Sequence, residues 1–166
     1  MSRQEDTGLV IDSLEFARAG EKRAGSLGIS RLKRLADALA DEAGALDWSL
    51  VGWRDEDGDS WLRLEVRGSL KLRCQRCLGA VDFPAAIDSR LQLVRPGEPW
   101  PDDGLEDDVS DAIAADKALS IEALVEDEVL LALPIAPRHE NCEAPRAVAV
   151  EQEPSPFGVL AKIRKH

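Results

Sequence analysis

Two runs of alternating apolar and polar residues, separated by a CxxC motif, most constrain the fold of this chain. In the first run, from Trp61 to Arg73, leucine and valine alternate with charged residues. In the second, over residues 81–93, valine, phenylalanine, isoleucine and leucine keep the same period. A period of two is typical of a β-strand with one buried face. The runs therefore predict two antiparallel strands with the CxxC, residues 74–77, at the tip of their hairpin.

Two further segments extend this pattern toward the N-terminus. Residues 46–53 also alternate, and Asp57-Gly58, which follows them, is a typical hairpin signal. Trp53 and Trp61 are expected to face each other across that hairpin. A looser alternation over residues 8–16 predicts an early strand.

Helical periodicity appears in two places. Ser30 is a candidate N-cap for a helix over residues 31–43, where leucines recur at helical spacing. Ser120 is a candidate N-cap for a helix over residues 121–133, which Pro134 ends. Glu122 and Glu126 lie one turn apart on that helix, and we interpret them as part of its solvated face. A third, short helix is expected after Ser155-Pro156.

These elements predict an α+β fold, an antiparallel β-sheet with a CxxC knuckle at a hairpin tip and two or three helices. We expect one α+β domain over residues 1–143, in which the acidic, proline-bearing stretch 96–111 is an exposed loop. Residues 144–166 are expected to form a linker and a basic C-terminal helix. A length of 166 residues fits one such domain with a tail.

The three cysteines and one of the two histidines form a complete ligand set for a tetrahedral metal ion. The candidate ligands are Cys74, Cys77, His139 and Cys142, and zinc is the candidate ion. Ordinary reduced thiols beside a turn are the alternative. A thioredoxin-like CxxC would open a helix, whereas the residues after Cys77 predict a strand. Gly79 is the residue expected to allow the tight turn of a zinc knuckle.

The net charge of −11 disfavours extensive binding to nucleic acid. Basic residues nevertheless gather in two places, which makes them candidates for a local contact with a partner, and solvated charge without a partner is the alternative. The candidates are Arg67, Lys71, Arg73, Arg76, Lys162, Arg164 and Lys165.

Several function classes find no support in the sequence. It contains no Ser/His/Asp set, P-loop or dinucleotide fingerprint, so we expect neither an enzyme nor a small-molecule substrate. No apolar stretch reaches the roughly 18 residues that a membrane span needs. With the polar N-terminus and the odd number of cysteines, this predicts a cytoplasmic protein with reduced thiols.

Three segments resemble the signatures of the large ribosomal RNA subunit accumulation protein family, YceD in its bacterial form. They are CQRC at 74–77, VEDEVLLALPIAPRHENCE at 125–143 and PSPFGVLAKIRK at 154–165. The resemblance implies a role in the accumulation, processing or assembly of large-subunit ribosomal RNA, without a known catalytic activity. The expected partner is then an rRNA precursor or a basic ribosomal protein. The alternative is a thiol redox or metal-transfer protein with an indirect ribosomal effect.

Overall fold

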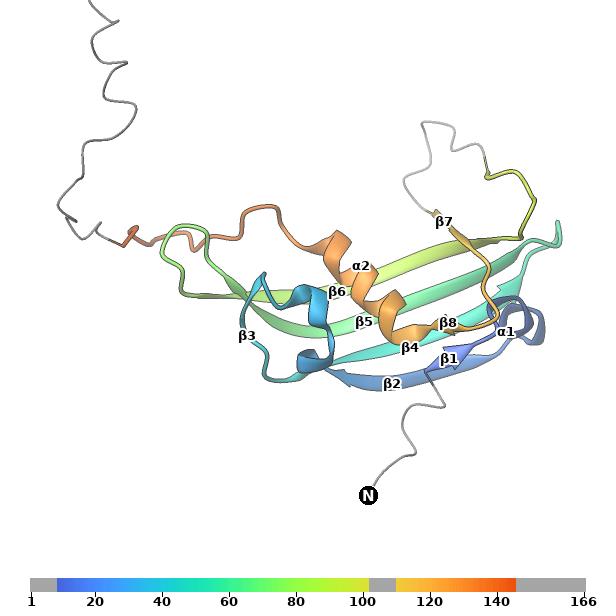
Figure 1. The fold of residues 1–166 in the computed structure, drawn as a ribbon, viewed down its shortest axis with the longest axis horizontal. Helices are drawn as coiled ribbons and strands as arrows, with labels where there is room; N and C mark the ends of the chain where they lie inside the picture. Colours follow the sequence, from blue (N-terminus) through green and yellow to red (C-terminus); the bar gives the residue numbers. More distant parts are fainter. Residues whose placement is uncertain (1–8, 102–109, 146–166) are drawn as a thin grey trace, which may run out of the picture.

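A six-stranded sheet forms the centre of the computed structural model, which describes residues 9–101 and 110–145 (Figure 1). Four of its strands lie side by side in the order β2 (Lys22–Gly28), β4 (Ala45–Arg54), β5 (Ser60–Arg73) and β6 (Ala80–Val94). Each of these strands is antiparallel to its neighbours. β7 (Asp111–Ala114) runs parallel to β6, and β3 (Leu39–Asp41) pairs with β5. A separate two-stranded sheet joins β1 (Val10–Ile11) to β8 (Leu119–Ser120).

The alternation in the sequence becomes the two faces of this sheet. In β5 the even-numbered positions Leu62, Leu64 and Val66 are buried in the core, whereas the odd-numbered positions between them are partly exposed. The predicted hairpin between β4 and β5 is confirmed. Trp53 pairs with Trp61, and Gly58 supplies the positive φ of 90° that the turn requires.

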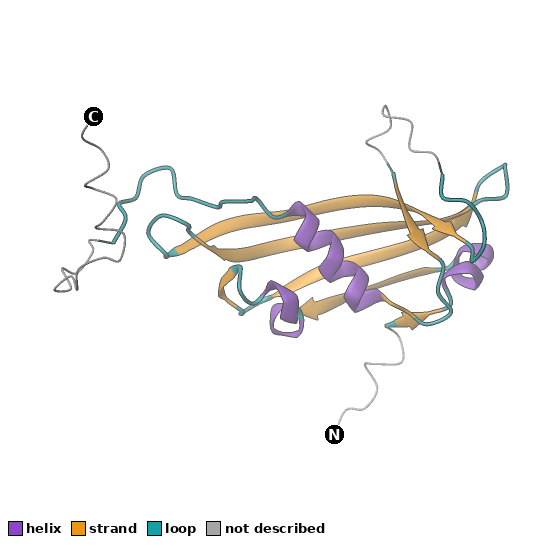
Figure 2. Cartoon of the chain, turned by 45° about the horizontal axis from the view of Figure 1, so that its top comes forward, coloured by secondary structure: helices purple, strands orange, loops and turns teal. Residues whose placement is uncertain are grey.

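The helices cover one face of the sheet, and Figure 2 shows α2 (Ile121–Ala132) lying across the strands. α2 begins as predicted, because the Ser120 side chain accepts a hydrogen bond of 3.2 Å from the Ala123 backbone N–H. α1 (Ser13–Ala19) packs on the same face over Gly52 of β4. The short 3₁₀ turns η1 (Ile29–Arg31) and η2 (Lys33–Leu35) contribute the buried residues Ile29 and Leu35 to the same core.

Two predicted elements are wrong. The early strand over residues 8–16 is limited to β1, because the Asp12 side chain accepts a hydrogen bond from the Glu15 N–H and starts α1. The helix over residues 31–43 is replaced by two 3₁₀ turns and β3. Its leucines are buried, but Leu39 is paired with Leu72 of β5, so sheet pairing overrides the local helical periodicity.

Other predicted features lie partly or wholly outside the described residues. This applies to residues 102–109 of the acidic stretch and to the C-terminal helix with Lys162, Arg164 and Lys165. Asp111, the last residue of the predicted loop, already belongs to β7. Within residues 9–101 and 110–145, no helix reaches the length and apolar character needed to cross a membrane.

Candidate metal centre

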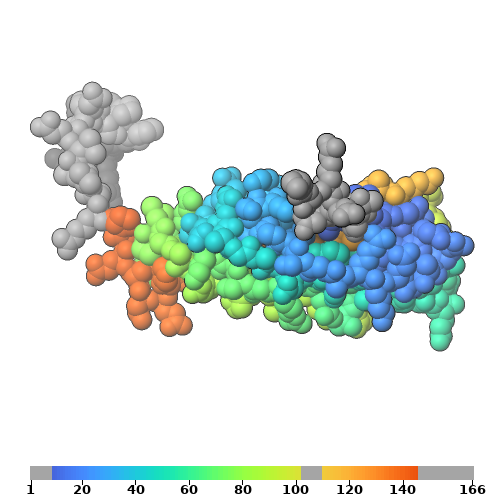
Figure 3. Space-filling model, turned by 90° about the horizontal axis from the view of Figure 1, so that it is seen from below, coloured from blue at the N-terminus to red at the C-terminus, as the bar shows by residue number. Residues whose placement is uncertain are grey.

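The six residues from Cys74 to Gly79 connect β5 to β6, whose last paired residues are Arg73 and Ala80. After α2 the chain returns to this end of the sheet, so that residues 134–145 lie beside the connection (Figures 1 and 3). A backbone hydrogen bond of 2.8 Å from Gln75 N–H to Pro137 O joins the two segments directly. The fold thus brings together parts of the chain that are far apart in the sequence.

The connection between β5 and β6 is a tight turn around Cys74. The Cys74 N–H donates to Gly79 O at 2.8 Å, and the Leu78 N–H donates to Cys74 O at 3.0 Å. Leu78, not Gly79, has the left-handed conformation, with φ of 64°. The role expected for Gly79 is therefore wrong. A Cβ on Gly79 would lie 3.4 Å from Cys77 Sγ, so this residue borders the thiol cluster instead.

The predicted ligands Cys74, Cys77, His139 and Cys142 lie together, with all ligand atoms within 4.8 Å of one another. Cys74 Sγ and Cys142 Sγ are 3.8 Å apart, and Cys77 Sγ and His139 Nδ1 are 3.3 Å apart. Ligands around tetrahedral zinc lie roughly 3.5 to 3.8 Å from one another, given bond lengths of about 2.3 Å to sulfur and about 2.0 Å to nitrogen. The four residues are therefore close enough to hold a metal ion.

The atoms around these side chains orient them toward a common centre. His139 Nε2 donates to Ala80 O at 2.8 Å, and Nδ1 lies on the side of the ring toward Cys77 Sγ. Arg76 Nη1 donates to Cys142 O at 3.3 Å and ties the second segment to the turn. Metal-binding histidines usually have such a second hydrogen bond through the other ring nitrogen.

The electrostatics of the cluster favour a thiolate at Cys74, which is fully buried. The backbone N–H groups of Cys77 and Arg76 point at its Sγ at 3.5 and 3.4 Å, and the Cys77 N–H chiefly lowers the pKa of Cys74 to about 5. Burial raises the pKa of Cys142, and the neighbouring cysteines raise it further. The hydrogen bond to Ala80 O raises the pKa of His139. A metal ion would release the protons that remain on this ligand set.

Four of the predicted basic contact residues lie in the described segments, and they differ in whether they have a partner within the protein. Arg67 is exposed on β5 and forms no ion pair with any described residue. Lys71 forms an ion pair with Asp82, Arg73 donates to Leu39 O at 3.2 Å, and Arg76 belongs to the thiol cluster. Three of the four therefore have partners within the protein.

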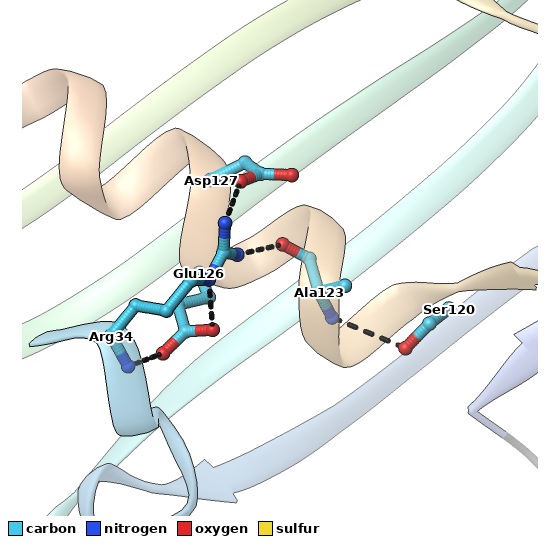
Figure 4. A network of polar contacts seen from close by, with 5 residues as sticks. All are labelled: Arg34, Ser120, Ala123, Glu126 and Asp127. Atoms are coloured by element: carbon cyan, nitrogen blue, oxygen red, sulfur yellow. Dashed lines mark hydrogen bonds and ion pairs between the residues drawn. The ribbon is translucent and has the colours of Figure 1, made fainter.

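The two helix carboxylates are not the solvated face that the sequence indicated. Glu126 is buried and accepts hydrogen bonds from the backbone N–H and the Nε of Arg34, both at 2.7 Å (Figure 4). Glu122 forms an ion pair of 2.6 Å with Arg31. Both carboxylates join α2 to the 3₁₀ turns η1 and η2, which the sequence does not predict.

Comparisons with known proteins agree with the family resemblance. The family model described as Large ribosomal RNA subunit accumulation protein YceD matches residues 62–164, a range that includes all four candidate ligands. A Haemophilus influenzae protein of the same description is 24% identical to this chain over an alignment of 169 positions that covers 95% of each of the two chains. No solved structure matches. Because the family model covers more than half of the chain, this protein belongs to the YceD family of large ribosomal RNA subunit accumulation proteins.

Proposed function

We propose that this protein is a non-catalytic, cytoplasmic factor of ribosome biogenesis that supports the accumulation or processing of large-subunit ribosomal RNA. Family membership is the observation that carries this proposal. The partner would be an rRNA precursor or a basic ribosomal protein. An acidic chain with a net charge of −11 suits temporary protection of a basic partner, and a local basic surface suits a limited contact with RNA.

In this proposal Cys74, Cys77, His139 and Cys142 bind one zinc ion as a structural knuckle. Thiolate and imidazole are the ligands that zinc prefers, and four protein ligands leave no open position for a substrate or water. The ion would fasten the segment after α2 to the turn between β5 and β6. The zinc would therefore stabilise the fold and would not take part in a reaction.

The redox or metal-transfer alternative has less support from the geometry. A redox CxxC depends on an accessible thiolate at the start of a helix. Here Cys74 is fully buried, and the residues after Cys77 lead into the strand β6. In this proposal Cys74→Ser lowers the melting temperature, whereas the redox alternative requires an unchanged melting temperature and a lost rate of thiol exchange.

The ribosomal role can be tested by deleting the gene in its host. We expect the ratio of large-subunit to small-subunit rRNA to fall in the deletion strain and to recover when the full chain is supplied. In-cell crosslinking, followed by identification of both the RNA and the peptides, would then name the partner. An unchanged rRNA ratio together with the recovery of neither rRNA nor ribosomal protein would refute the role.

A further inference from the structure

The face of the sheet opposite α1 and α2 has a charge that differs from the rest of the protein. Within β2, β4, β5 and β6, its outward positions hold six cations and four carboxylates, although the whole chain carries −11. The cations are Lys22, Arg63, Arg67, Lys71, Arg73 and Arg90, and the carboxylates are Asp47, Glu65, Asp82 and Asp88. We call these positions, together with Trp53 and Trp61, the outer face.

Strand register places the centre of the outer face in one row. Lys22 pairs with Val51, Val51 with Arg63, and Arg63 with Arg90. Three cations therefore lie in one row across four strands, with Val51 between the first and the second. A hollow of about 380 Å³ lies on this row. Trp53 and Glu65 also line it. The hollow therefore combines an aromatic wall with an excess of positive charge.

Two tryptophans form a fixed platform beside the row. The rings of Trp53 and Trp61 are stacked, with centroids 6.0 Å apart and an angle of 12° between their planes. Trp61 Nε1 donates to Asp55 Oδ2 at 2.8 Å, which fixes its ring against the turn. Both indoles stay partly exposed. Exposed, rigid aromatic rings on a sheet are suited to stacking with unpaired nucleic-acid bases.

Some of the cations on the outer face are already paired, and others are not. Arg63 forms a bidentate contact with Asp88, at 2.8 Å through Nε and 2.6 Å through Nη2, and a further ion pair of 3.1 Å with Glu65. The side chains of Lys22, Arg67 and Arg90 form no direct ion pair with any residue of the described ranges. The charges of Arg90 and Arg67 nevertheless add to the effect of Arg63, which chiefly lowers the pKa of Asp88. Lys22 and Arg90 line the hollow, and Arg67 lies beyond it on β5, with Glu65 between Arg67 and Arg63 on this face. These three are the cations available to a phosphate.

We propose that the outer face binds a short segment of single-stranded RNA. A base stacks on Trp53, and the adjoining phosphates contact Lys22, Arg67 and Arg90. The charge of −11 repels a polyanion at long range, so only a few phosphates are engaged and the salt dependence is shallow. This inference rests on the proposed ribosomal role for the identity of the RNA, and it names the surface that such a role would use.

The experiment measures fluorescence anisotropy of a labelled single-stranded RNA of mixed sequence, about 12 nucleotides long, titrated with the full chain at low salt. Trp53→Ala is expected to weaken binding by roughly tenfold to a hundredfold, as the loss of one stacked base does. The double variant Arg67→Glu/Arg90→Glu is expected to weaken it by at least about tenfold. Neither arginine contributes to the core, so the double variant decides the question even if Trp53→Ala unfolds.

Two matched variants serve as controls. Lys33→Glu/Lys117→Glu changes the net charge equally at exposed sites away from the outer face, and Trp100→Ala removes a tryptophan that is 59% exposed after β6. Both are expected to bind like the native chain. The proposal is overturned if the native chain does not bind the RNA, or if the control pair weakens binding as much as the outer-face pair.

The same variants separate this inference from the ribosomal role. If the native chain binds RNA through the outer face but its deletion leaves the rRNA ratio unchanged, the surface stands and the proposed function fails. If the deletion lowers the rRNA ratio and Arg67→Glu/Arg90→Glu restores it fully, the proposed function stands and the surface is overturned.

Discussion

Gly52 lies where α1 meets the sheet, and its lack of a side chain lets the two elements touch. A Cβ at this position would lie 2.8 Å from both Ala17 Cα and Phe16 O, which are backbone atoms that cannot move aside cheaply. We predict that Gly52→Ala lowers the free energy of unfolding by about 1–3 kcal/mol. Gly28→Ala is the control, because its nearest contact would be Ser30 Oγ at 3.7 Å. Equal unfolding free energies of the two variants in urea would contradict this account.

Asp55 connects the β4–β5 turn to the tryptophan platform. Its hydrogen bond from the Trp61 indole, more than those from backbone N–H groups, lowers the pKa of Asp55 below the ordinary 3.8. The folded state thus prefers the ionised carboxylate. The resulting stability is present above pH 3.8 and is lost as the pH falls through the lower folded-state pKa.

We therefore predict that Asp55→Asn makes the stability of the protein less dependent on pH in the acid range. Between about pH 5 and about pH 2.5 its melting temperature should fall less than that of the native chain. Asp57→Asn, in the same turn, is the control and should follow the native profile. A native-like acid profile for Asp55→Asn would show that this bond does not contribute.

At the scale of elements, the long strands could be predicted and the segment 31–43 could not. β4, β5 and β6 follow a period of two that no other structure satisfies, and α2 has both its cap and its proline stop. In residues 31–43 the leucines have helical spacing, yet the Arg73 N–H donates to Ala38 O and Leu39 pairs with β5. These partners lie more than thirty residues away, so local periodicity carries no information about them.

The junction between η2 and α2 depends on Arg34. Besides Glu126, its guanidinium contacts Asp127 Oδ1 at 2.6 Å and Ala123 O at 3.2 Å (Figure 4). The Glu126 side chain is only 10% exposed, and Arg34 is 50% exposed, so its charge is partly screened. We predict that Arg34→Ala lowers the free energy of unfolding by about 1–2 kcal/mol, mainly because the buried Glu126 loses the hydrogen bond from Nε and keeps only the one from the backbone N–H.

Arg18→Ala is the matched control for this prediction. Arg18 pairs with Glu15 one helical turn away, and both side chains are more than half exposed, so the variant should cost less than about 0.5 kcal/mol. Chemical denaturation of both variants measures the difference. Similar losses at the two sites would mean that the junction is no stronger than an ordinary surface pair.

At the scale of the whole molecule, the ligand set could be predicted from its inventory, because the chain has three cysteines and His139 lies near one of them. The path of the chain that brings the four ligands together could not be predicted. It depends on α2 crossing the sheet and on the return of residues 134–145 to the turn at Cys74. Only part of the outer face could be predicted from the sequence. The sequence of β5 predicts Arg67, Lys71 and Arg73 as contact residues, whereas the row of Lys22, Arg63 and Arg90 requires the register of four strands.

A metal at the centre would make the stability of the whole molecule depend on zinc. Chelation of the native chain, or Cys74→Ser, is expected to lower the melting temperature by at least about 5 °C, because the segment after α2 is released. Gln75→Ser, an exposed position in the same turn, is the control and should keep both the metal and the melting temperature. Loss of zinc should also accompany acidification, since protons compete for the thiolates and the imidazole.

The central claim, that Cys74, Cys77, His139 and Cys142 form a structural zinc site, is tested most directly by the metal content of the full chain. Plasma mass spectrometry of protein purified under reducing conditions, without added chelator or metal-affinity resin, should return about one zinc per chain for the native protein and for Gln75→Ser. Cys74→Ser should return far less. A native chain that contains no zinc, takes up none when it is supplied and melts at the same temperature with and without chelator would contradict the claim.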